Sequence, residues 1–528
     1  MIKDAFAKIL IFFNQWKWVF ILSFFCSILF FVLRLLNLTL FPIFADEAIY
    51  IRWAQVMRAE PTLRFLPLSV GSPPFFMWSM MPFLKLSQDP LFAGRFLSVI
   101  CGFGSLIGLF WLSFLIFGNK KISFFSILFY TVIPYYVFSE RMALIDSMLS
   151  LEAVWLVILA ILFIKKTQLD LAIIAGVVFG VSLMTKSFAV LFIIPLFSAL
   201  LLREWNLKKK EEFFANFIKT ILGLFLILGI GFGIYNFILR LGPNFSLISS
   251  RNDFGTYSLK EIIVHPLDPL LPHFYDLLDW FPNLISPVIF VFSLLGLFFG
   301  IKRKKKEAIF LVLCSFGPIL VESFLAKVFT PRYLLYAIWP FVILSSYFMD
   351  ILLTYFKEKQ PKLIFSFIGP IFLILLLIFP ALRYDWLLIN QPEKSPLPRN
   401  LRSGHLEEWS AGQGIKEVAD FLKKRAQGKK ILVGTEGSFG TLPDGLQIYL
   451  QNTPNITVIG IGLYPDKIPQ ALLNSLVDHD EVYLVINDER LAFKPETQNA
   501  IVIAKYPKAK RPNGTFQSLL LMRINPEK

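Results

Sequence analysis

The chain has 528 residues, of which 56% are hydrophobic, and its mean hydropathy is +0.63. A soluble domain does not have this balance, so the composition predicts a polytopic membrane protein. The net charge is +15, but the basic residues lie in short loops between apolar runs, which is typical of membrane loops and not of a nucleic-acid-binding surface.

Apolar runs occur along most of the first 381 residues. The first follows a short lead of 16 residues, expected in the cytoplasm, and has no small-residue cleavage site after it, so we expect an anchor and not a removed signal. Because a spanning helix needs roughly 20 mainly apolar residues, the runs predict about eleven spans. They lie near residues 17–40, 93–117, 122–138, 147–164, 170–185, 187–203, 215–240, 284–301, 308–325, 333–356 and 363–381.

Basic residues occupy alternate loops between these spans. The positive-inside rule places such loops in the cytoplasm. The residues concerned are Lys3 and Lys8 in the lead, then Lys120, Lys121, Lys165, Lys166, Arg203, Lys208 to Lys210, Lys302 to Lys306, Lys357, Lys359 and Lys362. The sequence therefore predicts a multi-pass protein of the plasma membrane. Its N-terminus is cytoplasmic, and its tail, residues 382–528, is extracytoplasmic.

Two adjacent carboxylates, Asp46 and Glu47, stand where the first span reaches the outer surface. Acids at a membrane edge are costly and tend to be functional. The alternative is that both are solvated and cap a short surface helix. The loop that holds them, residues 41–92, is too long for a simple connector. We expect two juxtamembrane helices in it, one over residues 48–57 and one after Pro73-Pro74.

Further charged residues are predicted at outer span ends. Asp146 follows Arg141 by five residues, and a simple pairing of the two is one interpretation. Lys186 ends a span within a glycine-containing stretch that lacks the second glycine of a nucleotide-binding loop. It and Arg332 either extend toward the membrane surface or bind a phosphate. Together these residues predict an outer cavity for a substrate with a long lipid, a phosphate and a hydroxylated head.

The outer loop 241–283 contains His265, His273, Asp268, Asp276 and Asp279 among aromatic residues. Their spacing matches no compact set of metal ligands, so we expect this loop to lie partly on the membrane.

The tail is polar after Arg383, and three prolines between residues 392 and 398 indicate a linker. Helix-like stretches at 414–425 and 444–451 alternate with strands at 430–433, 456–461, 482–486, 500–504 and 518–523, which predicts a small α/β domain. The glycine-rich stretch 434–440 has the wrong spacing for a dinucleotide site and is interpreted as a tight turn. The three cysteines, Cys26, Cys101 and Cys314, lie in apolar runs, so the tail has no disulfide framework.

Several motifs in order resemble the GT-C superfamily of polyprenyl-phosphate-sugar glycosyltransferases, especially its protein O-mannosyltransferase and aminoarabinose-transferase-like branch. They cover residues 40–340 and are Ala45-Asp-Glu-Ala-Ile-Tyr50, Gly71-Ser-Pro-Pro-Phe-Phe-Met-Trp78, Ala93-Gly-Arg-Phe-Leu-Ser98, Ser139-Glu-Arg-Met-Ala-Leu-Ile-Asp146, Gly180-Val-Ser-Leu-Met-Thr-Lys186 and Pro331-Arg-Tyr333. Two departures stand out. Ser72 replaces the basic residue that many relatives have before Pro-Pro, and the Trp-Trp-Asp signature of oligosaccharyltransferases is absent.

The resemblance implies an inverting transfer of a sugar from a polyprenyl-phosphate donor to an acceptor hydroxyl on a lipid, glycan or protein, at the outer face of the membrane. It implies Asp46 as the general base, with Glu47 as an alternative base or an orienting group. The implied substrate-binding residues are Tyr50, Arg95, Arg141, Asp146, Lys186, Arg332 and Tyr333. No residue is assigned to a metal, although a divalent cation is possible, and no nucleic acid is expected as a partner.

Two other classes of function remain open. A transporter or flippase of lipid-linked sugars would need alternating access and paired broken helices. A non-catalytic envelope assembly protein would tolerate replacement of its cavity carboxylates.

Overall fold

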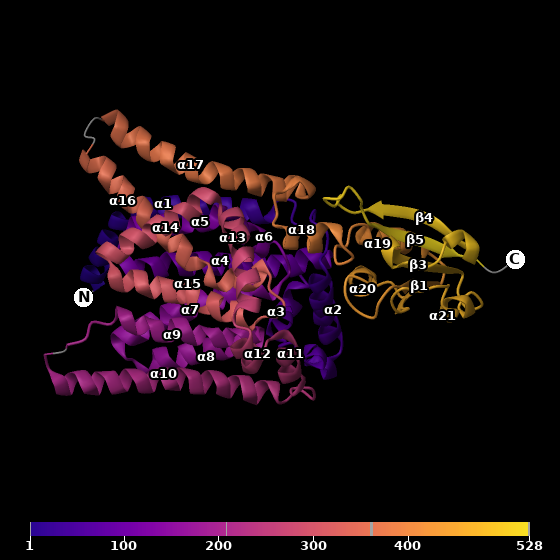
Figure 1. Cartoon of the computed structure of the whole chain (residues 1–528), viewed down its shortest axis with the longest axis horizontal. Coiled ribbons are helices and arrows are strands. Elements are labelled where there is room, and N and C mark those ends of the chain that lie inside the picture. The colour runs from indigo at the N-terminus through magenta and orange to yellow at the C-terminus, as the bar shows by residue number, and fades with distance from the viewer. Residues whose placement is uncertain (1, 207, 360–362, 526–528) are drawn as a thin grey trace.

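The computed structural model describes residues 2–206, 208–359 and 363–525. Long helices run side by side through most of the molecule, and a small sheet domain stands at one end of this bundle (Figure 1). The main bundle helices are α1 (Ile2–Leu35), α4 (Pro90–Phe117), α5 (Lys120–Val132), α6 (Pro134–Glu140), α7 (Ile145–Lys166), α8 (Leu169–Thr185), α9 (Ile193–Ser198), α10 (Lys210–Leu239), α13 (Leu267–Ile285), α14 (Pro287–Arg303), α15 (Lys305–Leu325), α16 (Trp339–Lys359) and α17 (Leu363–Asn390).

The predicted spans fall on helices of this bundle. By length and apolar composition, seven helices among the described residues can cross a membrane, or up to nine if each of two bent pairs is one span. The bent pairs are α5 with α6 and α13 with α14, and the shorter apolar helical stretches Leu169–Thr185 and Ser187–Leu202 cover two further predicted spans. The helical membrane fold is therefore confirmed, and the count of eleven stays a prediction.

Helix α4 illustrates how local sequence sets the helix ends. The Asp89 side chain caps its first turn by accepting from the backbone N–H groups of Leu91 and Phe92, and Pro90 occupies the first helical position. Gly118 closes the other end in the left-handed conformation, with φ at 64°. Asp89 also accepts from Lys416 of the sheet domain at 2.8 Å, so this cap helps to tie the two parts together.

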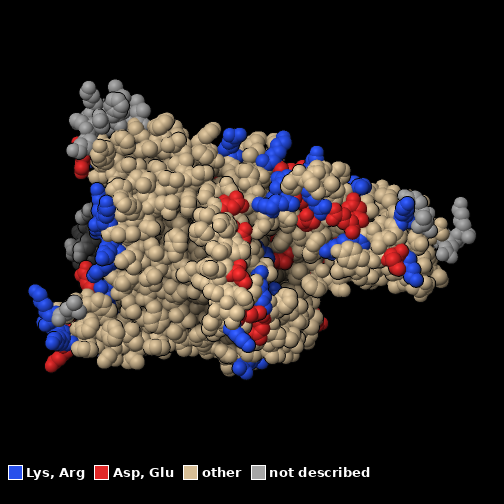
Figure 2. All heavy atoms as spheres, viewed as in Figure 1, with Lys and Arg blue, Asp and Glu red and all other residues tan. Residues whose placement is uncertain are grey.

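Lysine and arginine side chains gather along the end of the bundle opposite the sheet domain, on the side where α10 begins (Figures 1 and 2). This distribution agrees with the alternation of basic loops along the sequence. Among the residues expected there, Lys362 lies outside the described residues, as do the side chains of Lys3, Lys8 and Lys359. Which compartment each end faces stays a prediction.

The end next to the sheet domain carries short helices. They include α2 (Ala45–Ala59), α3 (Phe75–Phe83), α11 (Leu247–Gly255) and α12 (Leu259–Val264), and α2 and α3 lie where the sequence places helices in the first outer loop. The first outer loop approaches α11 closely at Gly71, where φ is 68° and a Cβ would lie 2.3 Å from the carbonyl oxygen of Leu247. Only glycine fits this contact.

The C-terminal domain is a five-stranded sheet with helices, as predicted. Its strands are β1 (Ile431–Thr435), β2 (Ile456–Gly460), β3 (Glu481–Asn487), β4 (Ala500–Pro507) and β5 (Ser518–Ile524), in the order β2-β1-β3-β5-β4. Strands β1, β2 and β3 are parallel, joined through α20 (Asp444–Leu450) and α21 (Gln470–Asn474), and β5 is antiparallel to β3 and β4. Every residue of β1 and β3 is buried, which explains the mainly apolar runs 431–433 and 482–486 within them.

The division of the chain at residue 382 stays a prediction, but the helix before it is longer than expected. Helix α17 continues to Asn390, so the expected domain start at residue 382 falls inside the helix. The sequence turns polar there, but Tyr384, Asp385 and Leu388 are buried side chains of α17. The polar residues after Arg383 therefore lie where α17 contacts other parts of the protein. They do not mark the end of the helix.

Candidate active site

A pocket of about 560 Å³ lies where α2, α7, α11, the end of α8 and the 3₁₀ helix η5 (Pro331–Ala337) meet. Its volume is in the range of small-molecule sites. Six of the nine predicted site residues line it: Asp46, Tyr50, Asp146, Lys186, Arg332 and Tyr333. Apolar and aromatic side chains, including Phe188, Leu191, Phe254 and Val328, form much of the remaining wall. The structure thus places the predicted acids and bases from distant segments around one cavity.

The first ion pair of the pocket joins Asp46 to Arg332, residues 286 positions apart. Arg332 Nη2 donates to Asp46 Oδ2 at 2.6 Å, and the side chains are 14% and 28% exposed. Asp46 lies in the first turn of α2, where the helix dipole favours a negative charge. Its other oxygen, Oδ1, makes no hydrogen bond among the described residues. Asp46 therefore presents an oriented carboxylate with free acceptor capacity to the pocket.

The second ion pair joins Lys186 to Asp146. Lys186 Nζ donates to Asp146 Oδ1 at 2.8 Å and lies 3.7 Å from the ring centroid of Tyr333. Lys186 has extended backbone, with φ at −157° and ψ at 138°, and it separates α8 from the 3₁₀ helix η3 (Ser187–Phe192). Pairing of Asp146 with Arg141, one sequence interpretation, is therefore wrong. Lys186 turns into the pocket because the helix breaks at this residue.

Tyr50 lies beside the first ion pair and is buried. Burial raises the pKa of its phenol, and the nearby Asp46 carboxylate raises it further. The phenol is therefore neutral and keeps its O–H donor at physiological pH. A neutral donor next to Asp46 suits the binding of a hydroxylated group.

Glu47 is adjacent to Asp46 in sequence but does not line the pocket. Its carboxylate is fully buried and accepts from Arg95 Nε and Nη2 at 2.8 and 2.7 Å, and from the backbone N–H groups of Phe44 and Ala143 at 2.9 and 2.6 Å. Arg95 also donates to the carbonyl oxygens of Leu38, Phe41 and Pro42. These four hydrogen bonds occupy the acceptor positions of the Glu47 carboxylate, so it is not free to accept a proton from a substrate. Of its two predicted roles, this geometry favours the orienting one, and Arg95, like Glu47, lies outside the residues that line the pocket.

Arg141 was also predicted to bind substrate, and the structure places it elsewhere. Its guanidinium donates to four carbonyl oxygens at the end of α1, those of Leu33, Arg34, Leu36 and Asn37, at 2.8–3.0 Å. These carbonyls are among the groups that a helix leaves without internal partners. Arg141 thus caps α1 and fixes the start of the first outer loop.

A basic pocket residue was missed at the sequence level. Arg251 of α11 lines the pocket and donates to the carbonyl oxygen of Val70 at 3.0 Å, and Ser72 of the first outer loop also lines the pocket. The outer loop 241–283 was interpreted as a membrane-lying segment, so its arginine carried no functional assignment. One signal in the sequence could have suggested a role for Arg251. The first outer loop lacks a basic residue before Pro73, so a basic residue from another segment could take that place. Among the charged residues lining the pocket, Arg251 makes no ion pair with an acid of the described residues.

The described residues contain no group of three or more His, Cys, Asp or Glu side chains that could hold a metal ion. In the pocket, Asp46 and Asp146 each face a cation. The histidines of loop 241–283 make other contacts: His273 lies against Phe329, and His265 is exposed beside Asp268.

Known families and folds agree with this geometry. The family described as dolichyl-phosphate-mannose-protein mannosyltransferase matches residues 71–243, and no curated protein sequence gives a significant match. Crystal structures of ArnT from Cupriavidus metallidurans superpose with TM-scores of 0.57 in the apo state and 0.56 bound to undecaprenyl phosphate. Each is 13% identical to this chain, and each alignment covers 96% of this chain and 98% of ArnT.

A third solved structure has a similar fold. The archaeal oligosaccharyltransferase AglB from Archaeoglobus fulgidus, in complex with an inhibitory peptide and a dolichol-phosphate, superposes with a TM-score of 0.50 at 11% identity, covering 90% of this chain and 70% of AglB. The resemblance to the GT-C superfamily is therefore confirmed, and with it the GT-C-like membrane fold with a small C-terminal domain. The family match covers residues 71–243, and the solved structures show that the fold is shared along most of the chain.

Proposed function

We propose that this protein is an inverting glycosyltransferase that moves a single sugar from a polyprenyl-phosphate donor to an acceptor hydroxyl at the outer face of the plasma membrane. The observation that carries the proposal is the Asp46–Arg332 pair, a carboxylate and a cation held 2.6 Å apart in a cavity with apolar walls. Such a pair offers the two groups that the reaction needs at one place: a proton acceptor and a phosphate ligand.

Asp46 is the proposed general base. The acceptor oxygen attacks the anomeric carbon, and the bond from that carbon to the phosphate oxygen breaks on the opposite face, so that its electron pair stays with the phosphate. The acceptor proton passes to Asp46, whose Oδ1 faces the pocket. Protonation removes the negative charge that holds Arg332. The guanidinium then becomes available to the phosphate as its charge increases, which couples proton transfer to stabilisation of the leaving group.

Three basic residues are proposed to bind the donor phosphate: Lys186, Arg251 and Arg332. Lys186 and Arg332 already face Asp146 and Asp46, so the pocket's acids compensate their charges in the absence of substrate. Arg251 makes a hydrogen bond only to a backbone carbonyl within the described residues, so its charge is the one that an incoming anion meets without competition. We therefore propose Arg251 as the first phosphate contact and Arg332 as the ligand of the transition state.

The lipid part of the donor is proposed to leave the pocket along its apolar wall. Phe254, Val190 and Val328 line the pocket and are also exposed at its edge, at 82%, 39% and 57%. Exposed apolar side chains at the mouth of a polar site suit a long isoprenoid chain in the bilayer. The undecaprenyl phosphate of ArnT and the dolichol-phosphate of AglB support a carrier of this class.

Transfer from defined donors to membrane acceptors tests the function. Purified protein is incubated with radiolabelled undecaprenyl-phosphate monosaccharides and with envelope fractions from cells that lack the gene, and labelled product is measured. We expect transfer from at least one donor, and loss of transfer with Asp46→Asn. Movement of donor across proteoliposome membranes without transfer would instead support a flippase. Full complementation of such cells by Asp46→Asn would support an assembly role.

The orientation is tested by cysteine labelling. A cysteine replacing Ser438 in the C-terminal domain should react with a membrane-impermeant thiol reagent in intact spheroplasts, and one replacing Lys304 between α14 and α15 should react only after lysis. The three native cysteines are buried and serve as the background control. The reverse labelling pattern would place the pocket on the cytoplasmic side and contradict an outer-face transferase.

A further inference from the structure

No residue after Tyr333 lines the pocket among those described, yet the C-terminal domain contacts the chain immediately before Asp46. Residues 403–412, here called the docking turn, connect α18 (Arg399–Arg402) to α19 (Ile415–Arg425). Its Ala411 pairs with Phe44 in an isolated antiparallel bridge. The N–H of Ala45 donates to the Ser410 carbonyl at 3.0 Å, and the N–H of Gly412 donates to the Ile43 carbonyl at 2.8 Å.

A side-chain stack reinforces this backbone pairing. The His405 imidazole lies flat on the Phe44 ring, with centroids 4.1 Å apart and planes inclined by 17°, and Phe138 meets it edge-on at 5.2 Å. His405 is 3% exposed. Phe44 also lies near the active site, since the Arg332 guanidinium is 5.4 Å from the Phe44 centroid. Phe44 therefore stands between the docking turn and the Asp46–Arg332 pair.

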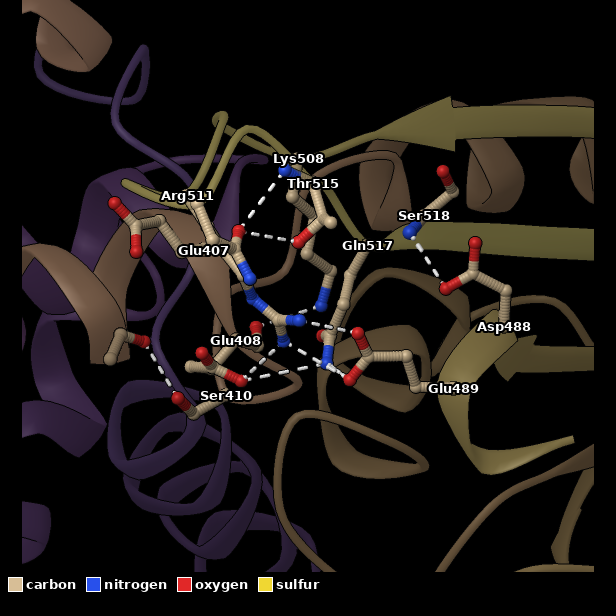
Figure 3. Close-up of polar contacts among 12 residues, drawn as sticks. Glu407, Glu408, Ser410, Asp488, Glu489, Lys508, Arg511, Thr515, Gln517 and Ser518 are labelled. Carbon is tan, nitrogen blue, oxygen red and sulfur yellow. Dashed lines mark hydrogen bonds and ion pairs between the residues drawn. The ribbon is translucent and has the colours of Figure 1, made fainter.

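The sheet domain in turn holds the docking turn from the far side. Lys508 Nζ donates to the Glu408 carbonyl at 2.8 Å, Arg511 Nη2 donates to the Glu408 carboxylate at 2.8 Å, and the N–H of Ala509 donates to the Leu406 carbonyl at 3.0 Å (Figure 3). These three donors come from the connection between β4 and β5. Figure 3 shows the side chains of Lys508 and Arg511 close to Glu408 of the turn.

We propose that the docking turn positions the catalytic carboxylate, with His405 acting through Phe44 to hold the first turn of α2 and hence Asp46 against Arg332. This proposal rests on the glycosyltransferase function proposed above. His405 is a positioning residue, since it touches neither Asp46 nor the pocket. Burial lowers its pKa to about 4, so the imidazole is neutral at physiological pH and acts by packing, not by charge.

The His405 variants separate positioning from donor binding. His405→Ala removes the ring that supports Phe44, and we expect kcat to fall about 10- to 100-fold, because small displacements of a catalytic group have effects of this size. Binding of undecaprenyl phosphate should stay within about two-fold of wild type. His405→Phe keeps the stack and should retain kcat within about three-fold, with an unchanged pH profile. His479→Ala, at the opposite edge of the same domain, is the matched control.

A second variant covers the case in which His405→Ala fails to fold. A Cβ on Gly412 would lie 2.5 Å from Ile43 Cγ2 and 2.8 Å from the Ile43 carbonyl oxygen, so Gly412→Ala pushes the 43–45 segment away from the turn. Gly229→Ala, where nothing lies within 4 Å, is its control. Hydrogen exchange of the peptide covering residues 43–48 reads the segment's order without any catalysis. It should rise in His405→Ala and Gly412→Ala and stay unchanged in His405→Phe and the controls.

Wild-type kcat and wild-type exchange in both His405→Ala and Gly412→Ala would overturn the proposal. So would a His405→Phe variant as slow as His405→Ala, because the role would then belong to the ring nitrogens. Absence of transfer by the wild-type protein from every donor would count against the glycosyltransferase function alone, since the exchange experiment tests positioning independently.

Discussion

The pocket and the polar network behind it are built from the same residue types but are connected differently. In the pocket, Asp46 and Asp146 each have one cationic partner and keep oxygen lone pairs free toward the cavity or its wall. In the network, Glu47 takes four hydrogen bonds and Arg141 gives four. Free hydrogen-bonding capacity thus marks the residues available to a substrate, and full satisfaction marks those that shape the backbone.

A second pair in the network follows the same rule. The Arg34 guanidinium, on α1, binds the Glu140 carboxylate and the carbonyl oxygens of Thr131 and Tyr130, and both side chains are buried. Buried charges are stable only when paired and hydrogen-bonded. Arg34, Glu140, Arg141, Arg95 and Glu47 therefore form one anchor for the turn that leads from α1 to Asp46.

The largest expected effect is that of Asp46→Asn on turnover. The substitution keeps size and polarity but removes the proton acceptor, so kcat should fall by about 10²–10⁴-fold. Melting temperature in detergent should change little, because the side chain is partly exposed. Transfer of labelled sugar and differential scanning fluorimetry measure the two quantities. Activity within a few-fold of wild type would remove Asp46 from the role of base.

Glu47→Gln should show the opposite pattern. It leaves Arg95 buried without its counter-charge, and breaking one partner of such a pair typically costs about 3–5 kcal/mol. We expect a clear fall in melting temperature and in yield of folded protein. The folded fraction should retain most of its turnover. A variant with wild-type stability and a hundred-fold loss of turnover would instead make Glu47 a catalytic residue.

Arg332 variants should lose less turnover than Asp46→Asn and more than Glu47→Gln. Arg332→Ala loses both the orientation of Asp46 and a phosphate ligand, so we expect about 10²-fold lower kcat/KM. Arg332→Lys should recover only part of this, because a guanidinium binds phosphate through two parallel hydrogen bonds and an ammonium cannot. Lys186→Ala should slow turnover by a smaller factor. Unchanged kinetics in Arg332→Ala would show that its pairing with Asp46 is purely structural.

Arg251→Ala is expected to have the smallest effect of the four. Arg251 is exposed at the pocket wall, so its loss should weaken binding of undecaprenyl phosphate several-fold while leaving kcat for bound donor nearly unchanged. Arg240→Ala, which lies outside the pocket and stacks on Phe245, is the matched control. Isothermal titration or native mass spectrometry measures the affinities. Equal affinity in Arg251→Ala and wild type would contradict its role as first contact.

Much of the bundle could be predicted because hydrocarbon imposes long apolar helices, and hydropathy reports them directly. The strands of the tail were placed within a few residues for a related reason, since β1 and β3 are buried on both faces. The end of α17 could not be placed this way. Asp385 is polar but buried in the tertiary structure, and its environment comes from helices far away in sequence.

Only some of the predicted site residues line the pocket, and helix geometry explains why. Asp46 and Glu47 are neighbours, but successive helix residues point about 100° apart, so one faces the cavity and the other faces Arg95. Which is which depends on contacts with Arg332 and Ala143, both distant in sequence. Arg251 was missed for the same reason, because the carbonyl oxygen that it binds belongs to Val70, 181 positions earlier.

The break at Lys186 has a consequence for the surrounding bilayer. Helix α8 has 17 residues and is therefore only about 25 Å long, while the hydrocarbon core of a typical bilayer is about 30 Å thick. A helix this short is accommodated by local thinning of the lipid or by drawing headgroups inward. We therefore expect lipid phosphates beside the Lys186 end of α8 to lie deeper than elsewhere in the bilayer. Under the proposed function, the phosphate of a lipid-borne donor would then reach the pocket without leaving the headgroup layer.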